Sequence, residues 1–168
     1  VPGFDPGTAG AGGGGRTPSM AVGRVLGVDA CPGGWVGVVL DRDRAIGRFA
    51  PTLAELVGPA DDDLRVIAID IPIGLPDTSV RQADVLVRGA LGPRRSSLFM
   101  TPVRAAVVAS TYDEANAINR RLVGQGVSRQ SFGLRSRVLE ADEFVVNRPE
   151  NVIEVHPELS FATMAGTP

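Results

Sequence analysis

The alternation of apolar runs and turn residues predicts β-strands in the first half of the chain. Runs rich in Val, Ile and Leu, bounded by Gly, Pro and Asp, predict strands over residues 24–30, 35–40, 45–50 and 65–71. Only short turns separate the first three runs, which indicates an antiparallel meander. The fourth run is almost continuously apolar, which is typical of a parallel strand buried on both faces.

Helical spacing and capping signals dominate the rest of the chain. Thr52 and Thr111 are each followed three residues later by Glu, so each predicts a capping box at the start of a helix. Apolar residues on one helical face predict helices over 80–91 and 134–145, and an apolar run predicts a fifth strand over 151–155. A meander that leads into alternating helices and strands predicts an α/β fold with a mixed sheet and helices on its faces.

Composition separates a tail from a single domain. Residues 1–19 contain seven Gly and three Pro, so we expect a disordered tail that buries too little apolar surface to fold. The remaining residues, 20–168, have the length of one domain. Apolar residues make up 43% of the chain, which is enough to supply a core.

Charge, cysteine content and hydropathy exclude several classes of protein. One Cys and one His exclude an intramolecular disulfide and a Cys/His zinc cluster. The net charge of −2 excludes a strongly basic nucleic-acid coat protein, but not a local basic groove. No apolar run has the length of a membrane span, and no signal peptide is recognisable at the N-terminus. We therefore expect a soluble, cytoplasmic protein without a membrane partner.

Three acids lie at or near the ends of predicted strands. Asp29 is near the end of the first strand, Asp70 near the end of the fourth, and Glu154 within the fifth. If the first and fourth strands are parallel neighbours, Asp29 and Asp70 lie close together and raise the pKa of at least one carboxyl. Carboxylates of this kind bind Mg²⁺ or Mn²⁺, and two such ions can clamp a phosphodiester. The alternative is structural, because Asp is common where a strand enters a turn.

Other polar residues are candidates for substrate or proton binding. His156, beside Glu154, is a candidate general base or metal ligand, or a structural histidine. A polar stripe on the helix over 80–91 and the arginines that follow it are candidates to hold phosphates: Arg81, Asp84, Arg88, Arg94 and Arg95. The alternative for this stripe is a solvated helix face with pairing between residues three apart.

Five long segments, in order, resemble a known family. They are GVDACPGGWVGVVL (27–40), AIDIPIGLP (68–76), RQADVLVRGALGPRRSSLFMTPVR (81–104), SRQSFGLRSRVLEAD (128–142) and EVHPELSF (154–161). Together they resemble domain-of-unknown-function family 429, whose members are described as predicted nucleases of the RNase H-like fold. The similarity spans residues 24–166.

The resemblance implies a site and a departure from the family pattern. It implies that Asp29, Asp70 and Glu154 bind the metal. It also implies that Arg81, Asp84, His156 and Glu158 lie near the site. Members of the family look longer, with further acids in a C-terminal helix, so we expect this chain to be truncated at the C-terminus.

We therefore expect an RNase H-like domain that hydrolyses nucleic acid with Mg²⁺ or Mn²⁺. In this reading Asp29, Asp70 and Glu154 hold the metal, and His156 moves a proton. Two alternatives stay open: a non-catalytic member that binds nucleic acid or protein, and an enzyme that acts on a small phosphorylated substrate. The sequence leaves the oligomeric state and the choice between DNA and RNA open.

Overall fold

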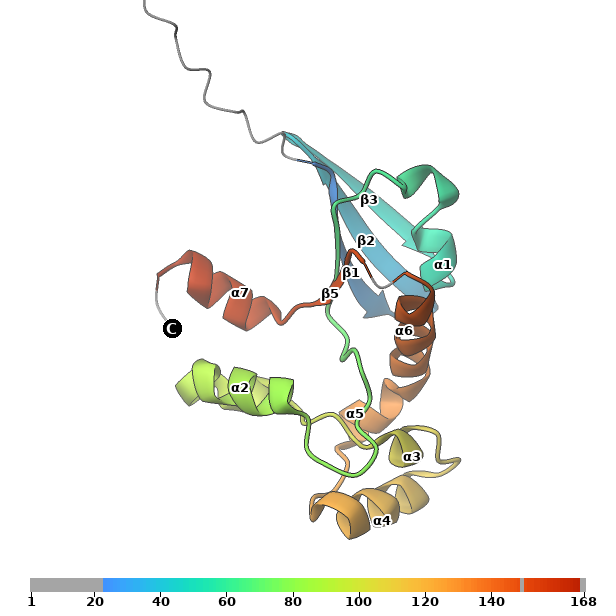
Figure 1. Cartoon of the computed structure of the whole chain (residues 1–168), viewed down its shortest axis with the longest axis vertical. Helices are drawn as coiled ribbons and strands as arrows, with labels where there is room; N and C mark the ends of the chain where they lie inside the picture. The colour runs from blue at the N-terminus through green and yellow to red at the C-terminus, as the bar shows by residue number, and fades with distance from the viewer. Residues whose placement is uncertain (1–22, 149, 167–168) are drawn as a thin grey trace, which may run out of the picture.

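A five-stranded mixed sheet forms the centre of the computed structural model, which describes residues 23–148 and 150–166 (Figure 1). The strands are Val25–Cys31 (β1), Gly34–Asp41 (β2), Arg44–Ala50 (β3), Val66–Ile69 (β4) and Val152–Glu154 (β5). Each overlaps one strand that the apolar runs predict. With the helices around it, this sheet confirms the predicted α/β class.

The order of the strands confirms the predicted antiparallel meander and mixed sheet. The sheet runs β3-β2-β1-β4-β5. β1, β2 and β3 pair antiparallel as a meander, whereas β1 with β4 and β4 with β5 pair parallel. The carboxyl ends of β1, β4 and β5 therefore meet at one edge of the sheet, and Asp29, Asp70 and Glu154 lie near these ends.

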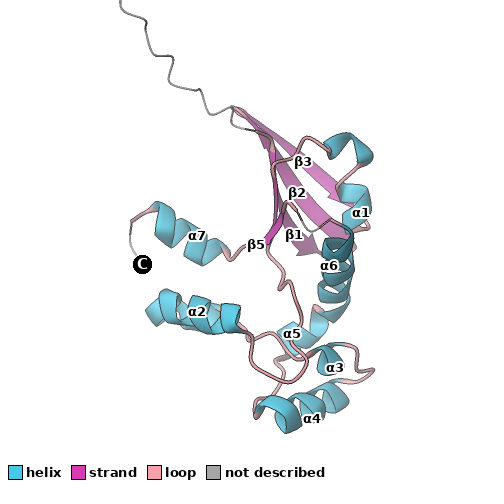
Figure 2. Ribbon diagram, viewed as in Figure 1, coloured by secondary structure: helices cyan, strands magenta, loops and turns pink. Residues whose placement is uncertain are grey.

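Seven α-helices and two short 3-10 helices are present in the described residues (Figure 2). The α-helices are Leu53–Leu56 (α1), Gln82–Leu91 (α2), Arg104–Val107 (α3), Tyr112–Val123 (α4), Arg129–Gly133 (α5), Arg135–Asn147 (α6) and Pro157–Met164 (α7). The 3-10 helices are Pro59–Asp61 (η1) and Gly92–Ser97 (η2).

Both predicted N-caps are confirmed. The hydroxyl of Thr52 accepts a hydrogen bond from the Glu55 amide at 3.3 Å, and that of Thr111 accepts one from the Glu114 amide at 3.2 Å. The sequence did not predict α3, α5 or the 3-10 helices, because each is too short to show a helical period.

The core lies between the sheet and two of the helices. α1 and α6 cover the same face of the sheet (Figure 1). Side chains from the sheet and from these helices share one buried cluster, which includes Leu26, Trp35, Ile67, Leu53 and Val138. A second, smaller cluster joins α3, α4 and the segment before α5.

The opposite face of the sheet remains open. On β2, Val36, Val38 and Leu40 are 39%, 45% and 44% exposed, and they alternate with buried neighbours as a strand requires. The prediction that the fourth strand is buried on both faces is therefore wrong. Ile67 and Ile69 are buried, but Val66 and Ala68 are only partly covered, because α1 and α6 lie on the other side.

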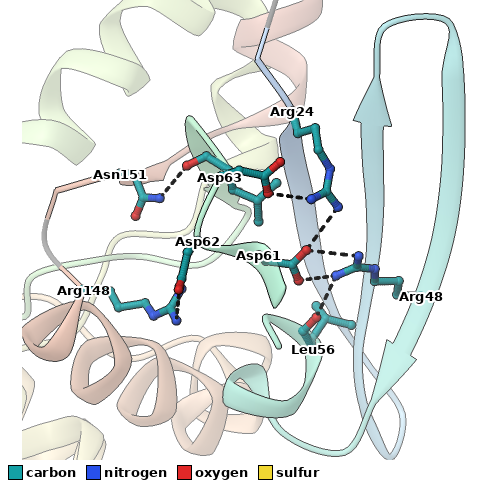
Figure 3. A network of polar contacts seen from close by, with 9 residues as sticks. Arg24, Arg48, Leu56, Asp61, Asp62, Asp63, Arg148 and Asn151 are labelled. Carbon is teal, nitrogen blue, oxygen red and sulfur yellow. Dashed lines mark hydrogen bonds and ion pairs between the residues drawn. The ribbon is translucent and has the colours of Figure 1, made fainter. Parts of the chain in front are cut away.

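A buried acid ties η1 to the sheet. Asp61 is 2% exposed and accepts hydrogen bonds from Arg48 of β3 and, at 3.1 Å, from Arg24 just before β1 (Figure 3). The hydrogen bond from Arg48 outweighs burial and lowers the pKa of Asp61 below its usual value. Such pairing offsets the cost of burying the carboxylate, so the cluster is structural.

Two further expectations concern the tail and the membrane. The predicted disordered tail, residues 1–19, lies outside the described residues. Among the helices that the structure describes, none has both the length and the hydrophobicity to cross a bilayer.

Candidate functional site

Two of the predicted acids lie at neighbouring positions of adjacent parallel strands. The parallel pairing of β1 and β4 ends at Val28 and Ile69. The next residues along the chain are Asp29, which is still within β1, and Asp70, which comes just after β4. The amide of Asp70 donates to the carbonyl of Val28 at 3.0 Å, which extends the pairing by one step. The structure therefore brings Asp29 and Asp70 side by side at the carboxyl edge of the sheet, as the topology predicts.

These acids open onto a cavity of about 330 Å³. Its walls come from the ends of β1, β4 and β5, from the start of α2 and α7, and from the segment after η2. The acids and the histidine that line it are Asp29, Asp70, Asp84, Glu154, His156 and Glu158. The only arginine among the lining residues is Arg81.

The pKa of Asp70 responds to this crowding. Burial and then the charge of Asp29 raise it from 3.8 to about 6, while His156 acts in the opposite direction. Glu158 and Glu154 add smaller effects in the same direction as Asp29. This agrees with the expectation that the two adjacent acids raise the pKa of at least one carboxyl.

Asp29 keeps part of its carboxylate free of backbone contacts. Its Oδ1 atom accepts a hydrogen bond from the Ala30 amide at 2.7 Å, and no hydrogen bond is recorded for its other oxygen within the described residues. The residue is exposed at the mouth of the cavity. A carboxylate held in this way can still offer an oxygen to a ligand.

Glu154 lies in the same cavity but is paired with Arg81. The guanidinium donates to both carboxylate oxygens, at 2.6 and 2.7 Å. The amide of Ile73 donates to one of them at 2.9 Å. This is a bidentate Arg–carboxylate pair, a geometry that is stronger and more specific than a single ion contact.

The helical period places Val80, Ala83, Val87 and Leu91 on one face of the predicted helix over 80–91. Of these the structure buries only Leu91, and the other buried residue of α2 is Asp84. Asp84 is 1% exposed, and its carboxylate accepts from the amide of Thr101 at 2.7 Å and from Arg81. Because these donors satisfy the carboxylate, α2 can turn a charged residue inward.

The remaining arginines of the predicted phosphate site lie outside the cavity. Arg88 of α2 and Arg94 and Arg95 of η2 are exposed, and none of them lines the cavity. Ser97, at the end of η2, does line it, so this basic segment lies next to the cavity mouth. The structure therefore separates Arg81, which is paired inside, from three arginines outside.

His156 and Glu158 stand at the start of α7. The imidazole is 15% exposed, and its Nδ1 atom lies 3.1 Å from a carboxylate oxygen of Glu158. The contact lacks hydrogen-bond geometry, and Nδ1 is buried without a hydrogen-bond partner among the residues that the structure describes. It is an ion pair only when the imidazole is protonated.

Sequence reasoning missed two backbone donors of this site. Thr101 holds Asp84, and the amide and carbonyl of Ile73 hold Glu154 and Arg81. Neither Thr nor Ile is a residue type that indicates such a role in a sequence. Only the path of the loops that carry Ile73 and Thr101 brings their backbone groups to the cavity. In residues 23–148 and 150–166, no group of three or more His, Cys, Asp or Glu side chains is arranged to hold a metal ion.

Comparison with known proteins gives a family but no activity. A search of curated proteins and a search of solved structures each found no match. A family model described as "Protein of unknown function (DUF429)" matches residues 27–168, which is most of the chain and includes every acid of the cavity. The chain therefore belongs to the DUF429 family of proteins of unknown function.

Proposed function

We propose that this protein is a divalent-cation-dependent phosphodiesterase of the RNase H-like type that hydrolyses nucleic acid. One observation carries the proposal: Asp29 and Asp70 lie side by side just after the last paired residues of two parallel strands, and both line one cavity. Adjacent carboxylates without a cation between them repel each other. A hard divalent cation bound by both carboxylates removes that repulsion, and the pair then holds the ion that the proposed hydrolysis requires.

The donor set suits one Mg²⁺ or Mn²⁺ ion held by two carboxylates. Mg²⁺ in proteins is commonly bound through one or two carboxylates and keeps several waters. Asp29 and Asp70 meet this requirement, with substrate phosphate and water as the other ligands. A bound ion supplies Lewis-acid stabilisation of phosphoryl oxygens. Glu154 as a third metal ligand stays a prediction, and its pairing with Arg81 suits another role, argued below.

The other residues of the cavity suit binding and proton transfer. His156 faces the same cavity as the two aspartates, so its imidazole can move a proton at the reacting oxygen. Glu158 lies beside it, with a carboxylate oxygen 3.1 Å from Nδ1. The exposed Arg88, Arg94 and Arg95, which lie outside the cavity, could offer charge-assisted hydrogen bonds to phosphates beyond the scissile one.

The size of the cavity favours a second candidate, an enzyme that acts on a small phosphorylated substrate. A volume of about 330 Å³ is at the lower end of the range for small-molecule sites, roughly 300–1,000 Å³. The enclosed walls also carry acids rather than a run of free arginines. In this candidate the same Asp29–Asp70 pair and the same cation would act on one phosphate ester.

Hydrolysis assays with a substrate-length series test the proposal. Purified protein is incubated with Mn²⁺ or Mg²⁺ and with single-stranded RNA, single-stranded DNA, dinucleotides and a mononucleotide ester. We expect cleavage of the oligomers that is lost with chelator and in both Asp29→Asn and Asp70→Asn. Cleavage confined to the mononucleotide ester favours the second candidate. Metal-independent cleavage, or full activity in both variants, contradicts the proposal.

A further inference from the structure

We propose that Arg81 is a positioning residue that keeps Glu154 off the cation, so that the ion at the site is held by Asp29 and Asp70 alone. The inference rests on the proposed function and deepens it, because it defines which carboxylates are ligands. It differs from the expectation that Glu154 completes a three-carboxylate set. It comes from the contacts of Glu154 and Arg81, not from the sequence pattern.

The oxygens of Glu154 are already occupied. One accepts from Arg81 at 2.6 Å, and the other accepts from Arg81 at 2.7 Å and from the Ile73 amide at 2.9 Å. A metal ion would have to replace at least one charge-assisted hydrogen bond to reach this carboxylate. By contrast, no such partner is recorded for the second oxygen of Asp29 within the described residues.

Arg81 is itself fixed on its other side. Its guanidinium donates to Asp84 Oδ1 at 2.5 Å and 2.9 Å and to the carbonyl of Ile73 at 2.6 Å. Asp84 is fully buried and is held in turn by the amide and hydroxyl of Thr101. Arg81 therefore joins the start of α2, the loop after β4 and the end of β5, and one of its terminal nitrogens donates to both Asp84 and Glu154.

The charges in the cavity also favour pairing of Glu154 with Arg81 over binding of Glu154 to the cation. Burial and hydrogen bonding act in opposite directions on Arg81, and the hydrogen bonds to Glu154 and Asp84 prevail, so its pKa stays above the usual value. The positive charge of Arg81 thus compensates the negative charge of Glu154.

Direct Mn²⁺ binding to the full chain tests whether Asp29 and Asp70 bind the ion and Glu154 does not. The electron paramagnetic resonance signal of free Mn²⁺ follows the binding, so no activity readout is needed. The variants are Glu154→Gln, Asp70→Asn and, as a remote control on α6, Glu143→Gln. Gln at position 154 keeps an oxygen that can accept from Arg81 and Ile73, so the fold is retained. We expect Glu154→Gln and the control to keep a Kd within about threefold of the parent, and Asp70→Asn to weaken binding at least about tenfold.

A second variant tests the role of Arg81. Arg81→Gln frees Glu154 to reach the ion, so we expect tighter Mn²⁺ binding by about tenfold, since an added carboxylate ligand raises cation affinity. The double variant that combines Arg81→Gln with Glu154→Gln should bind Mn²⁺ with the Kd of the parent. If Arg81→Gln does not fold because Asp84 loses its partner, the Kd of Glu154→Gln for Mn²⁺, compared with that of the parent, still shows whether Glu154 is a ligand.

The outcomes separate the two proposals. A loss of affinity beyond threefold in Glu154→Gln, with Mn²⁺ still bound by the parent, overturns this inference and leaves the proposed function intact. A folded Arg81→Gln that binds Mn²⁺ no more tightly than the parent also overturns it. Absence of Mn²⁺ binding by the parent at millimolar concentration overturns the proposed function itself, and this inference with it.

Discussion

Replacing Asp70 by Asn should stabilise the protein at neutral pH in the absence of divalent cations. In the folded state the pKa of Asp70 is about 6, against 3.8 in the unfolded chain, because the carboxyl is partly buried beside Asp29. The folded state therefore holds a proton more tightly than the unfolded state. Between about pH 3.8 and 6 the stability from this group is progressively lost as pH rises.

The size of the effect follows from this difference in pKa. Without solvent screening, a rise in the pKa of Asp70 from 3.8 to about 6 destabilises the folded state by about 3 kcal/mol once the carboxyl is ionised. The side chain is partly exposed, so solvent screening reduces this value, and we expect about 1–1.5 kcal/mol. For a domain of this size that is an increase in Tm of about 3–6 °C.

Thermal melts in chelator, at pH 7.5 and at pH 3.5, provide the assay. Asp70→Asn should raise the Tm at pH 7.5 and have little effect at pH 3.5, where the carboxyl is protonated in both states. The matched control is Asp43→Asn, an exposed acid in the turn between β2 and β3, which should change the Tm at neither pH. An Asp70→Asn protein that is no more stable than the parent at pH 7.5 refutes the claim that unneutralised charge is crowded at this site.

Two further predictions concern the scaffold. Asp61→Asn removes the charge that Arg24 and Arg48 share, so unfolding in urea should show a loss of about 2 kcal/mol at pH 7. Because the folded pKa of Asp61 is lowered, this loss should shrink as pH falls below 3.8; a loss that stays constant with pH would contradict the role of the ion pairs. Thr111→Ala should lower stability by about 1 kcal/mol through loss of the α4 cap, whereas Thr111→Ser, which keeps the hydroxyl, should recover most of it; equal losses would exclude the cap.

Local signals in the sequence were sufficient for the strands and the longer helices. The apolar runs place the five strands, and if β4 lies parallel beside β1, as it does, Asp29 and Asp70 are expected to meet. The capping threonines were likewise predictable, because the contacts they make lie within one helical turn.

The same reasoning did not extend to contacts made by loops. Periodicity on α2 favours Val80, Ala83 and Val87 as the covered face, but Asp84 is buried because Thr101, distant in sequence, supplies the donors. The pairing of Glu154 with Arg81 also depends on how the segment after β4 folds back. The open face of the sheet was missed because a run such as 65–71 shows apolarity without showing which helices cover it.

The location of a bound cation tests the central claim most directly. A crystal grown or soaked with Mn²⁺ gives anomalous density only where the ion lies. The account predicts a peak within coordination distance, about 2.0–2.6 Å, of carboxylate oxygens of both Asp29 and Asp70. Glu154 should remain paired with Arg81. Ordered Asp29 and Asp70 side chains with no anomalous peak between them, at millimolar Mn²⁺, would contradict it.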